Sequence, residues 1–157
     1  MKIVKQIAVL FSMITLIFVA CNTAQDKNTE ETVFELNDGT TVMLDENNNL
    51  ATVNNWGDFN SANEALLGLE SRDYEISMNN LENLRGSIAN LSSSIPQSLR
   101  TEEVLEDIED VQEEYRTLMN ESNEPVKNIK QNIEELVEKF DDLREELYET
   151  VEDYSTK

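Results

Sequence analysis

Two periodicities divide the chain into a short alternating segment and a long helical one. Apolar side chains alternate with polar ones in two runs, whose same-face positions are Phe34 and Leu36, then Val42 and Leu44. Asn37-Asp38-Gly39 separates the runs, and glycine accepts the positive φ that a tight hairpin needs. Residues 50–53 have a similar composition. The pattern therefore predicts a β-hairpin or a three-stranded meander.

From Ser61 onward the apolar positions recur at helical spacing. A first helix of about 35 residues is predicted up to Pro96. Its seam, the apolar stripe that repeats every seven residues, consists of Leu67, Tyr74, Leu81, Ile88 and Ile95. The second seam position is apolar only later, at Leu84 and Leu91, and is Glu70 and Ser77 earlier. Because glycine costs up to about 1 kcal/mol in a helix, we expect a break or bend near Gly68–Arg72.

Two further helices of about 20 and 30 residues are predicted after Pro96. Thr101 suits an N-cap, and the second helix ends near Asn120, with inward positions Val104, Ile108, Val111, Tyr115 and Leu118. Pro125 suits the start of the third. The third helix has two seams, which are Val126, Ile133, Phe140, Leu147 and Tyr154, and Ile129, Leu136, Leu143 and Thr150. Val137, Tyr148 and Val151 widen its stripe.

These elements predict a mainly α fold, an antiparallel bundle of three main helices with a small N-terminal β-hairpin or meander. Short connections favour antiparallel neighbours. The unequal helix lengths leave apolar surface for the hairpin, for a fourth short helix near 61–69 or for another chain. Trp56 and Phe59 are expected to form a lid over one end of the helices, with insertion into a partner's groove as the alternative.

The first 21 residues have the pattern of an export signal. Lys2 and Lys5 precede an apolar run from Ile7 to Ala20. A helix of that length spans about 21 Å, whereas a bilayer core of about 30 Å needs roughly 20 apolar residues. The run is therefore short for a permanent membrane span.

Phe18-Val19-Ala20-Cys21 closes this run and resembles the lipobox of bacterial lipoproteins, with phenylalanine where leucine is usual. The resemblance implies cleavage between Ala20 and Cys21 and a diacylglycerol on the Cys21 thiol, and two or more acyl chains make a stable anchor. The alternatives are an ordinary signal peptide with an incidental cysteine and an uncleaved anchor helix. The predicted segments are a signal peptide (1–20), a lipidated cysteine and disordered tether (21–32), a β region (33–56) and an acidic helical region (57–157).

The charge of the chain restricts its partners. Removal of residues 1–20 takes away two of the 12 basic residues and none of the 33 acidic ones, which leaves a net charge of −23. So acidic a chain is repelled by nucleic acid. The expected attractions are to basic proteins and, weakly, to divalent cations. The simpler interpretation of the acidic helices is a solvated face.

Candidate catalytic chemistry is absent from the sequence. It has no histidine, its one cysteine is Cys21, and no glycine-rich phosphate loop is present. Asp45-x-Asn47-x-Asn49 begins like a calcium loop, but Leu50 and Trp56 stand where the glycine and the glutamate are needed, so an asparagine-rich turn is expected. We therefore expect no enzyme activity, no cofactor and no dedicated metal site.

The sequence thus predicts a lipid-anchored protein of the bacterial cell envelope. Asn22 is not the acidic residue that retains enterobacterial lipoproteins at the inner membrane, so the resemblance favours the outer membrane, on either face. In style the chain resembles small coiled-coil-type lipoproteins of Bacteroidota. The expected role is a non-enzymatic helical interaction module that binds an envelope protein or a second copy. The alternatives are a chaperone-like protein that holds unfolded clients and a divalent-cation-binding envelope protein.

Overall fold

The computed structural model describes residues 32–45, 47, 49–71, 78–121 and 125–155. These residues are mainly helical and include a small three-stranded antiparallel sheet. The predicted signal peptide, the cleavage position Ala20–Cys21 and the segment 22–31 lie outside the described residues, as do Tyr74 and Ser77 of the first predicted helix.

The sheet has the order β1-β2-β3, formed by β1 (Thr32–Glu35), β2 (Thr41–Leu44) and β3 (Leu50–Val53). Gly39 adopts a φ of +80° in the first turn, as the hairpin requires. The four same-face positions pack inward, with Phe34 half-buried and Leu36, Val42 and Leu44 buried. The predicted hairpin and its third strand are therefore confirmed.

Asp38 fastens the hairpin turn to a distant part of the chain. Its Oδ1 accepts the N–H of Thr40 at 3.0 Å, and its Oδ2 accepts the N–H of Ser98 at 2.9 Å. Ser98 belongs to the short 3-10 helix η1 (Gln97–Leu99). Desolvation of the carboxylate favours its neutral form, but these N–H donors outweigh that effect and lower the pKa of Asp38 to about 2.

The first predicted helix is divided, so a single helix of about 35 residues is wrong. The described residues form α2 (Gly57–Glu70), α3 (Met78–Asn83) and α4 (Arg85–Ser94) in its place. The end of α2 falls within the break expected near Gly68–Arg72, and α2 matches the alternative of a separate short helix. Leu67 was expected in the seam but is 44% exposed. Phe59, Ala62, Leu66 and Leu69 define the buried face of α2 instead, and Leu67 points away from it.

The last two helices follow the predicted bounds closely. Thr101 caps α5 (Glu102–Asn120) by accepting the N–H of Val104 at 3.1 Å, and all five predicted inward positions of α5 are buried. In α6 (Val126–Ser155) the buried apolar residues are Ile133, Leu136, Val137, Phe140, Leu143, Leu147 and Val151. Tyr154, expected in the seam, is 40% exposed because the last turn of α6 extends past the surface that covers Val151.

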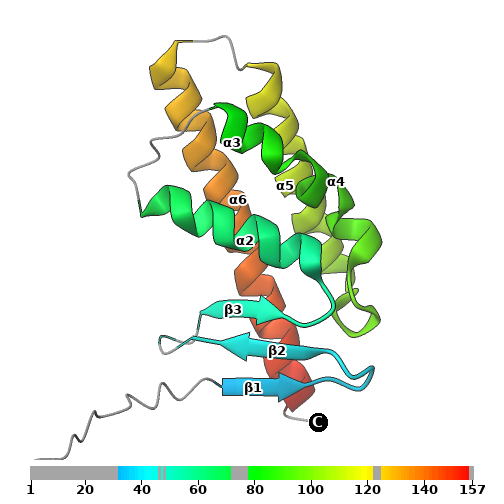
Figure 1. The fold of residues 1–157 in the computed structure, drawn as a ribbon. Coiled ribbons are helices and arrows are strands. Elements are labelled where there is room, and N and C mark those ends of the chain that lie inside the picture. The colour runs from blue at the N-terminus through cyan, green and yellow to red at the C-terminus, as the bar shows by residue number, and fades with distance from the viewer. Residues whose placement is uncertain (1–31, 46, 48, 72–77, 122–124, 156–157) are drawn as a thin grey trace, which may run out of the picture.

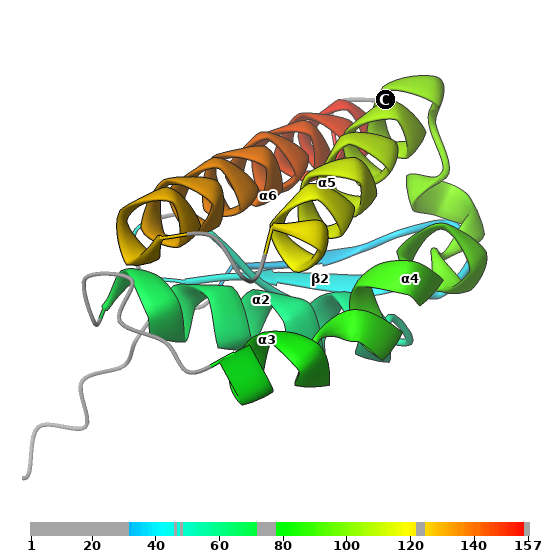
Figure 2. The same cartoon turned by 90° about the horizontal axis from the view of Figure 1, so that it is seen from above.

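The helices lie in two layers with the sheet at one end. Figure 2 shows α5 and α6 side by side in one layer and α2, α3 and α4 in the other. In Figure 1 the sheet lies beyond α2, with β3 nearest to it, and the C-terminal half of α6 passes behind the strands. Both α2 and α6 contact β3. Strand β3 therefore contacts both the helix that follows it directly and the last helix, which is far away in sequence.

An aromatic stack fills the interior between α2 and α6. The rings of Trp56 and Phe59 lie 4.9 Å apart, and those of Phe59 and Phe140 lie 5.4 Å apart, with all three side chains fully buried. The Trp56 Nε1 donates to the carbonyl of Leu91 at 3.3 Å, which satisfies its one polar group. Trp56 and Phe59 therefore pack inside the described fold, whereas they were expected as a lid over one end of the helices.

Candidate functional site

A groove opens where α2, α6 and β3 meet, and we call it the α2–α6 groove. Its volume is about 810 Å³, which is within the range of ligand-binding sites. The turn from Asp45 to Asn49 and strand β3 form one wall, and the facing surfaces of α2 and α6 form the others. The groove is therefore built from an N-terminal part of the described chain (residues 45–70) and from its last helix (residues 141–148).

Asp45 holds the turn that forms the rim of this groove. Its Oδ1 accepts the N–H of Asn47 at 2.8 Å and the N–H of Asn49 at 2.9 Å. These bonds outweigh the desolvation of the carboxylate and lower the pKa of Asp45. The predicted asparagine-rich turn is confirmed. Among the described residues, no group of three or more Asp, Glu, His or Cys side chains is placed to hold a metal ion.

Two asparagines of α2 cover the outer edge of β3. The side-chain amide of Asn60 accepts the N–H of Val53 at 2.9 Å and donates to the carbonyl of Val53 at 2.8 Å. The Nδ2 of Asn63 donates to the carbonyl of Ala51 at 3.0 Å. Asparagine side chains thus take the hydrogen bonds that a fourth strand would make, which fixes α2 against the sheet.

Arg144 lies at the floor of the groove and is only 9% exposed. Its Nε donates to Asn63 Oδ1 at 2.7 Å, and its Nη1 contacts Glu70 Oε1 at 3.4 Å and Asp141 Oδ1. The guanidinium carbon is 4.9 Å from the centre of the Phe140 ring. Its Nη2 is buried and has no hydrogen-bond partner among the described residues. We call Asn63, Glu70, Asp141 and Arg144 the Arg144 cluster, and it ties α6 to α2.

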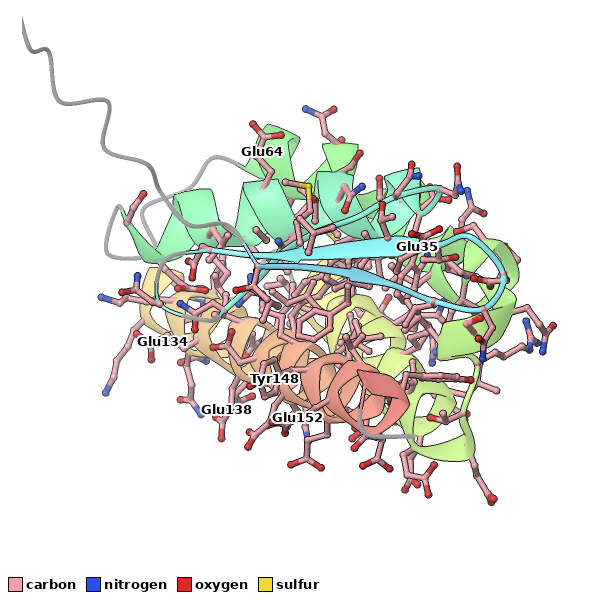
Figure 3. All side chains as sticks on the ribbon, turned by 90° about the horizontal axis from the view of Figure 1, so that it is seen from below. Glu35, Glu64, Glu134, Glu138, Tyr148 and Glu152 are labelled. Carbon is pink, nitrogen blue, oxygen red and sulfur yellow. The ribbon has the colours of Figure 1, made fainter. Side chains whose placement is uncertain are left out.

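The open surface of the groove combines apolar and acidic side chains. Leu67 is exposed and Tyr148 is half-buried, and both line the groove. The charged lining residues besides Arg144 are all acidic, namely Asp45, Glu64, Glu70, Asp141 and Glu145. Figure 3 shows Glu64 on α2 and Tyr148 on α6, on opposite sides of the strands in that view. With Glu70 and Asp141 paired to Arg144, the remaining carboxylates give the rim a negative potential.

The predicted site residues and the groove are different parts of the chain. Ala20 and Cys21 lie outside the described residues. Tyr148 was expected to widen a buried stripe, and it instead lies half-buried at the groove. Arg144 was not singled out, although it stands seven residues after Val137 and seven before Val151. A charged residue in an apolar stripe is the signal that would have indicated it.

The acidic side chains of α5 and α6 form a second notable surface. Glu134, Glu138 and Glu152 project outward from α6 (Figure 3) and are exposed, as expected for a solvated face. Partial burial, with neighbouring carboxylates, raises the pKa of Asp107, Glu114 and Glu146. Lys139 lies among these acids, with its Nζ 3.2 Å from Asp110 and 3.5 Å from Asp142.

None of the helices formed by the described residues has the length and apolar character required to cross a membrane. No protein-family model, no curated protein and no solved structure matches the chain.

Proposed function

We propose that the chain is a lipid-anchored protein of the bacterial cell envelope, favoured at the outer membrane, that presents a non-enzymatic acidic helical interaction module. The lipobox-like segment ending at Cys21 supports the anchor. The α2–α6 groove supports the interaction module. Its exposed Leu67, set among carboxylates, is the observation that carries the proposal.

We further propose that the helices form an antiparallel bundle, with α5 and α6 as two main members and the α2–α4 segment as the third. Two observations support this arrangement. Glu103 at the start of α5 lies near enough to Glu146, close to the end of α6, to act on its pKa. The apolar faces of α5 and α6 are buried along most of their length. Spin labels at positions 103 and 149 should give a short distance, and a distance above about 30 Å, the length of a 20-residue helix, would contradict the arrangement.

The chemistry of the groove indicates the kind of partner. An exposed leucine and a half-buried tyrosine favour an apolar side chain, and the acidic rim favours positive charge. The net charge of −23 expected for the lipidated chain attracts basic proteins over long range. We propose that the groove binds a basic segment of an envelope protein, with one apolar side chain placed against Leu67.

Site-directed photocrosslinking in living cells tests this proposal. A photoreactive residue at position 67 should crosslink one envelope protein, and the same residue at Glu134, on the outward face of α6, should not. The double variant Glu64→Lys/Glu145→Lys should abolish the crosslink, because it reverses two charges of the rim. Crosslinks to many unrelated proteins would favour the chaperone-like alternative. Identical crosslinks from both positions would contradict a partner in the groove.

The anchor is tested separately by the Cys21→Ser variant. The wild-type chain should fractionate with membranes, and its signal peptide should be removed. Cys21→Ser should lose both the lipid and the membrane association. If Cys21→Ser fractionates like the wild type, the lipid anchor is refuted and an uncleaved helix is favoured. Calcium titration at physiological salt tests the cation-binding alternative, for which binding at submillimolar concentration is the required result.

A further inference from the structure

A second groove, between α4 and α5, has the opposite charge. We call it the α4–α5 groove. Its volume is about 450 Å³, and its charged lining residues are Arg85 and Arg116, with no aspartate or glutamate among the described side chains that line it. A positively charged groove is unusual in a chain with 33 acidic and 12 basic residues. Figure 2 shows α4 and α5 next to each other, so the groove lies on one side of their contact.

The uncharged polar groups at the floor of this groove already have partners. The Gln112 Nε2 donates to the carbonyls of Ile88 at 2.9 Å and Ala89 at 3.3 Å. The Tyr115 hydroxyl donates to the carbonyl of Leu81 at 2.7 Å. Arg85 lies near the Tyr115 hydroxyl and opposes the burial that raises the pKa of that group, and both residues line the groove. Gln112 and Tyr115 therefore fix the floor rather than offer free donors.

The two guanidinium groups are the charged donors of the groove, and Asn120 adds an uncharged amide to its lining. Each carries five N–H groups and no acceptor. Arg85 and Arg116 are exposed, and neither forms an ion pair with a carboxylate in the part of the chain that the structure describes. Ala89, which is exposed, and Met119, which is half-buried, add an apolar surface beside them. The groove thus combines positive charge with a small apolar floor.

We propose that the α4–α5 groove binds a small organic anion, a carboxylate that carries a short apolar chain. The carboxylate accepts hydrogen bonds from Arg85 and Arg116, and the chain lies against Ala89 and Met119. A polyanion does not fit this proposal, because the acidic remainder of the protein repels an extended negative chain. The site is independent of the α2–α6 groove and of the function proposed for it.

The test is a titration of the full-length chain in a non-ionic detergent with hexanoate, followed by NMR of methyl-labelled methionines. The methyl of Met119 should shift and saturate with a dissociation constant of about 1 mM, which is ordinary for a ligand of this size. The methyl of Met43 lies on β2 and should not shift, which controls for general detergent effects. Acetate lacks the apolar chain and hexylamine lacks the negative charge, so both should bind at least about tenfold more weakly.

Variants identify the groups responsible. Arg85→Gln and Arg116→Gln should each weaken hexanoate binding about five- to tenfold. Arg100→Gln, an exposed arginine outside the groove, should leave binding unchanged. Glu82, whose charge reaches Tyr115 without lining the groove, repels the anion, so Glu82→Gln should strengthen binding about twofold. The proposal is overturned if Met119 does not shift, if hexylamine binds equally well, or if both groove variants bind like the Arg100→Gln control.

Discussion

Replacement of Arg144 by methionine tests whether the Arg144 cluster stabilises the fold. Methionine keeps an unbranched apolar chain against Phe140 but removes every polar contact of the guanidinium. The competing expectation is that the variant loses no stability, because the desolvation of a buried charge often costs as much free energy as its contacts contribute. The direction of the stability change is therefore informative in itself.

The size of the effect follows from the exposure of each partner. Asn63 is 2% exposed, so its Oδ1 would lose its donor where water does not reach, at a cost of about 1–3 kcal/mol. The side chains of Glu70 and Asp141 are 32% and 55% exposed. Water replaces the guanidinium there, and each lost pair costs about 0.2–1 kcal/mol. Loss of the cation–π contact adds about 0.5–1 kcal/mol, and relief of charge burial offsets part of the total. We expect a net loss of about 2–3 kcal/mol.

Urea unfolding followed by fluorescence measures this loss directly, because the single tryptophan, Trp56, is fully buried. The melting temperature should fall by about 6–12 °C. Arg116→Met, at an exposed arginine, should change stability by less than about 0.5 kcal/mol. In a double-mutant cycle with Asn63→Ala, the coupling should be about 1–2 kcal/mol. If Arg144→Met is as stable as the wild type, the reasoning is refuted and the buried charge costs more than its contacts contribute.

Three further predictions follow from the described contacts. Stability should rise as the pH falls from 7 toward the ordinary carboxyl values of 3.8–4.5, because the pKa values of Asp107, Glu114 and Glu146 are raised and their ionised forms oppose folding. In more acid solution stability should fall as Asp38, whose pKa is lowered to about 2, is protonated. A urea midpoint independent of pH would contradict both effects. Leu66→Ala should lower the free energy of unfolding by about 2–5 kcal/mol, because Leu66 is fully buried. Leu67→Ala should lower it by less than about 0.5 kcal/mol in the same assay, because Leu67 is exposed. Equal losses would show that Leu67 is part of the core. Lys139→Gln should lower stability by about 0.5–1 kcal/mol at low salt, because Asp110 and Asp142 lose their shared cation. The loss should shrink in 1 M NaCl, because salt screens the charges of exposed side chains. A loss that does not depend on salt would indicate that Lys139 acts through packing instead.

The parts of the fold that the sequence predicted are those specified by nearby residues. Gly39 and the alternating side chains around it determine the hairpin within about a dozen positions. Thr101 caps α5 through a contact three residues away. The stripe of α6 is wide and regular, so its buried face was readable without knowledge of the other helices.

The prediction of one long first helix was wrong because a seven-residue repeat was extended across a segment where the second seam position is polar and helix propensity is low. Gly68 and the polar seam position Glu70 lie where α2 ends. A heptad count that starts at Leu67 also shifts the expected face by one residue, because the buried face of α2 contains Leu66. The local pattern indicated the interruption but not which face packs inward, since Phe140 and Arg144 of α6 help to define that face.

The Arg144 cluster was beyond the reach of a sequence pattern because its central pair, Arg144 and Asn63, is separated by 81 positions. A buried arginine is acceptable only when partners from other elements surround it. Neither groove follows from periodicity, because each is formed by side chains from helices that meet only in the folded chain. The net charge can be counted from the sequence alone, and it indicates that a basic partner suits the acidic groove.

The contact of β3 with α6 has a consequence for how the chain reaches its native state. Strand β3 packs against the last described helix, and Arg144 and Phe140 of α6 complete the surroundings of Asn63 and Phe59. A chain that crosses a membrane with its N-terminus first would deliver the sheet early and α6 last. Helix α2 would cover part of β3 as soon as it emerges, but this surface would be completed only when α6 arrives. Folding should therefore be a single late, cooperative event after the C-terminus emerges, and truncation within α6 should unfold the sheet as well as the helix.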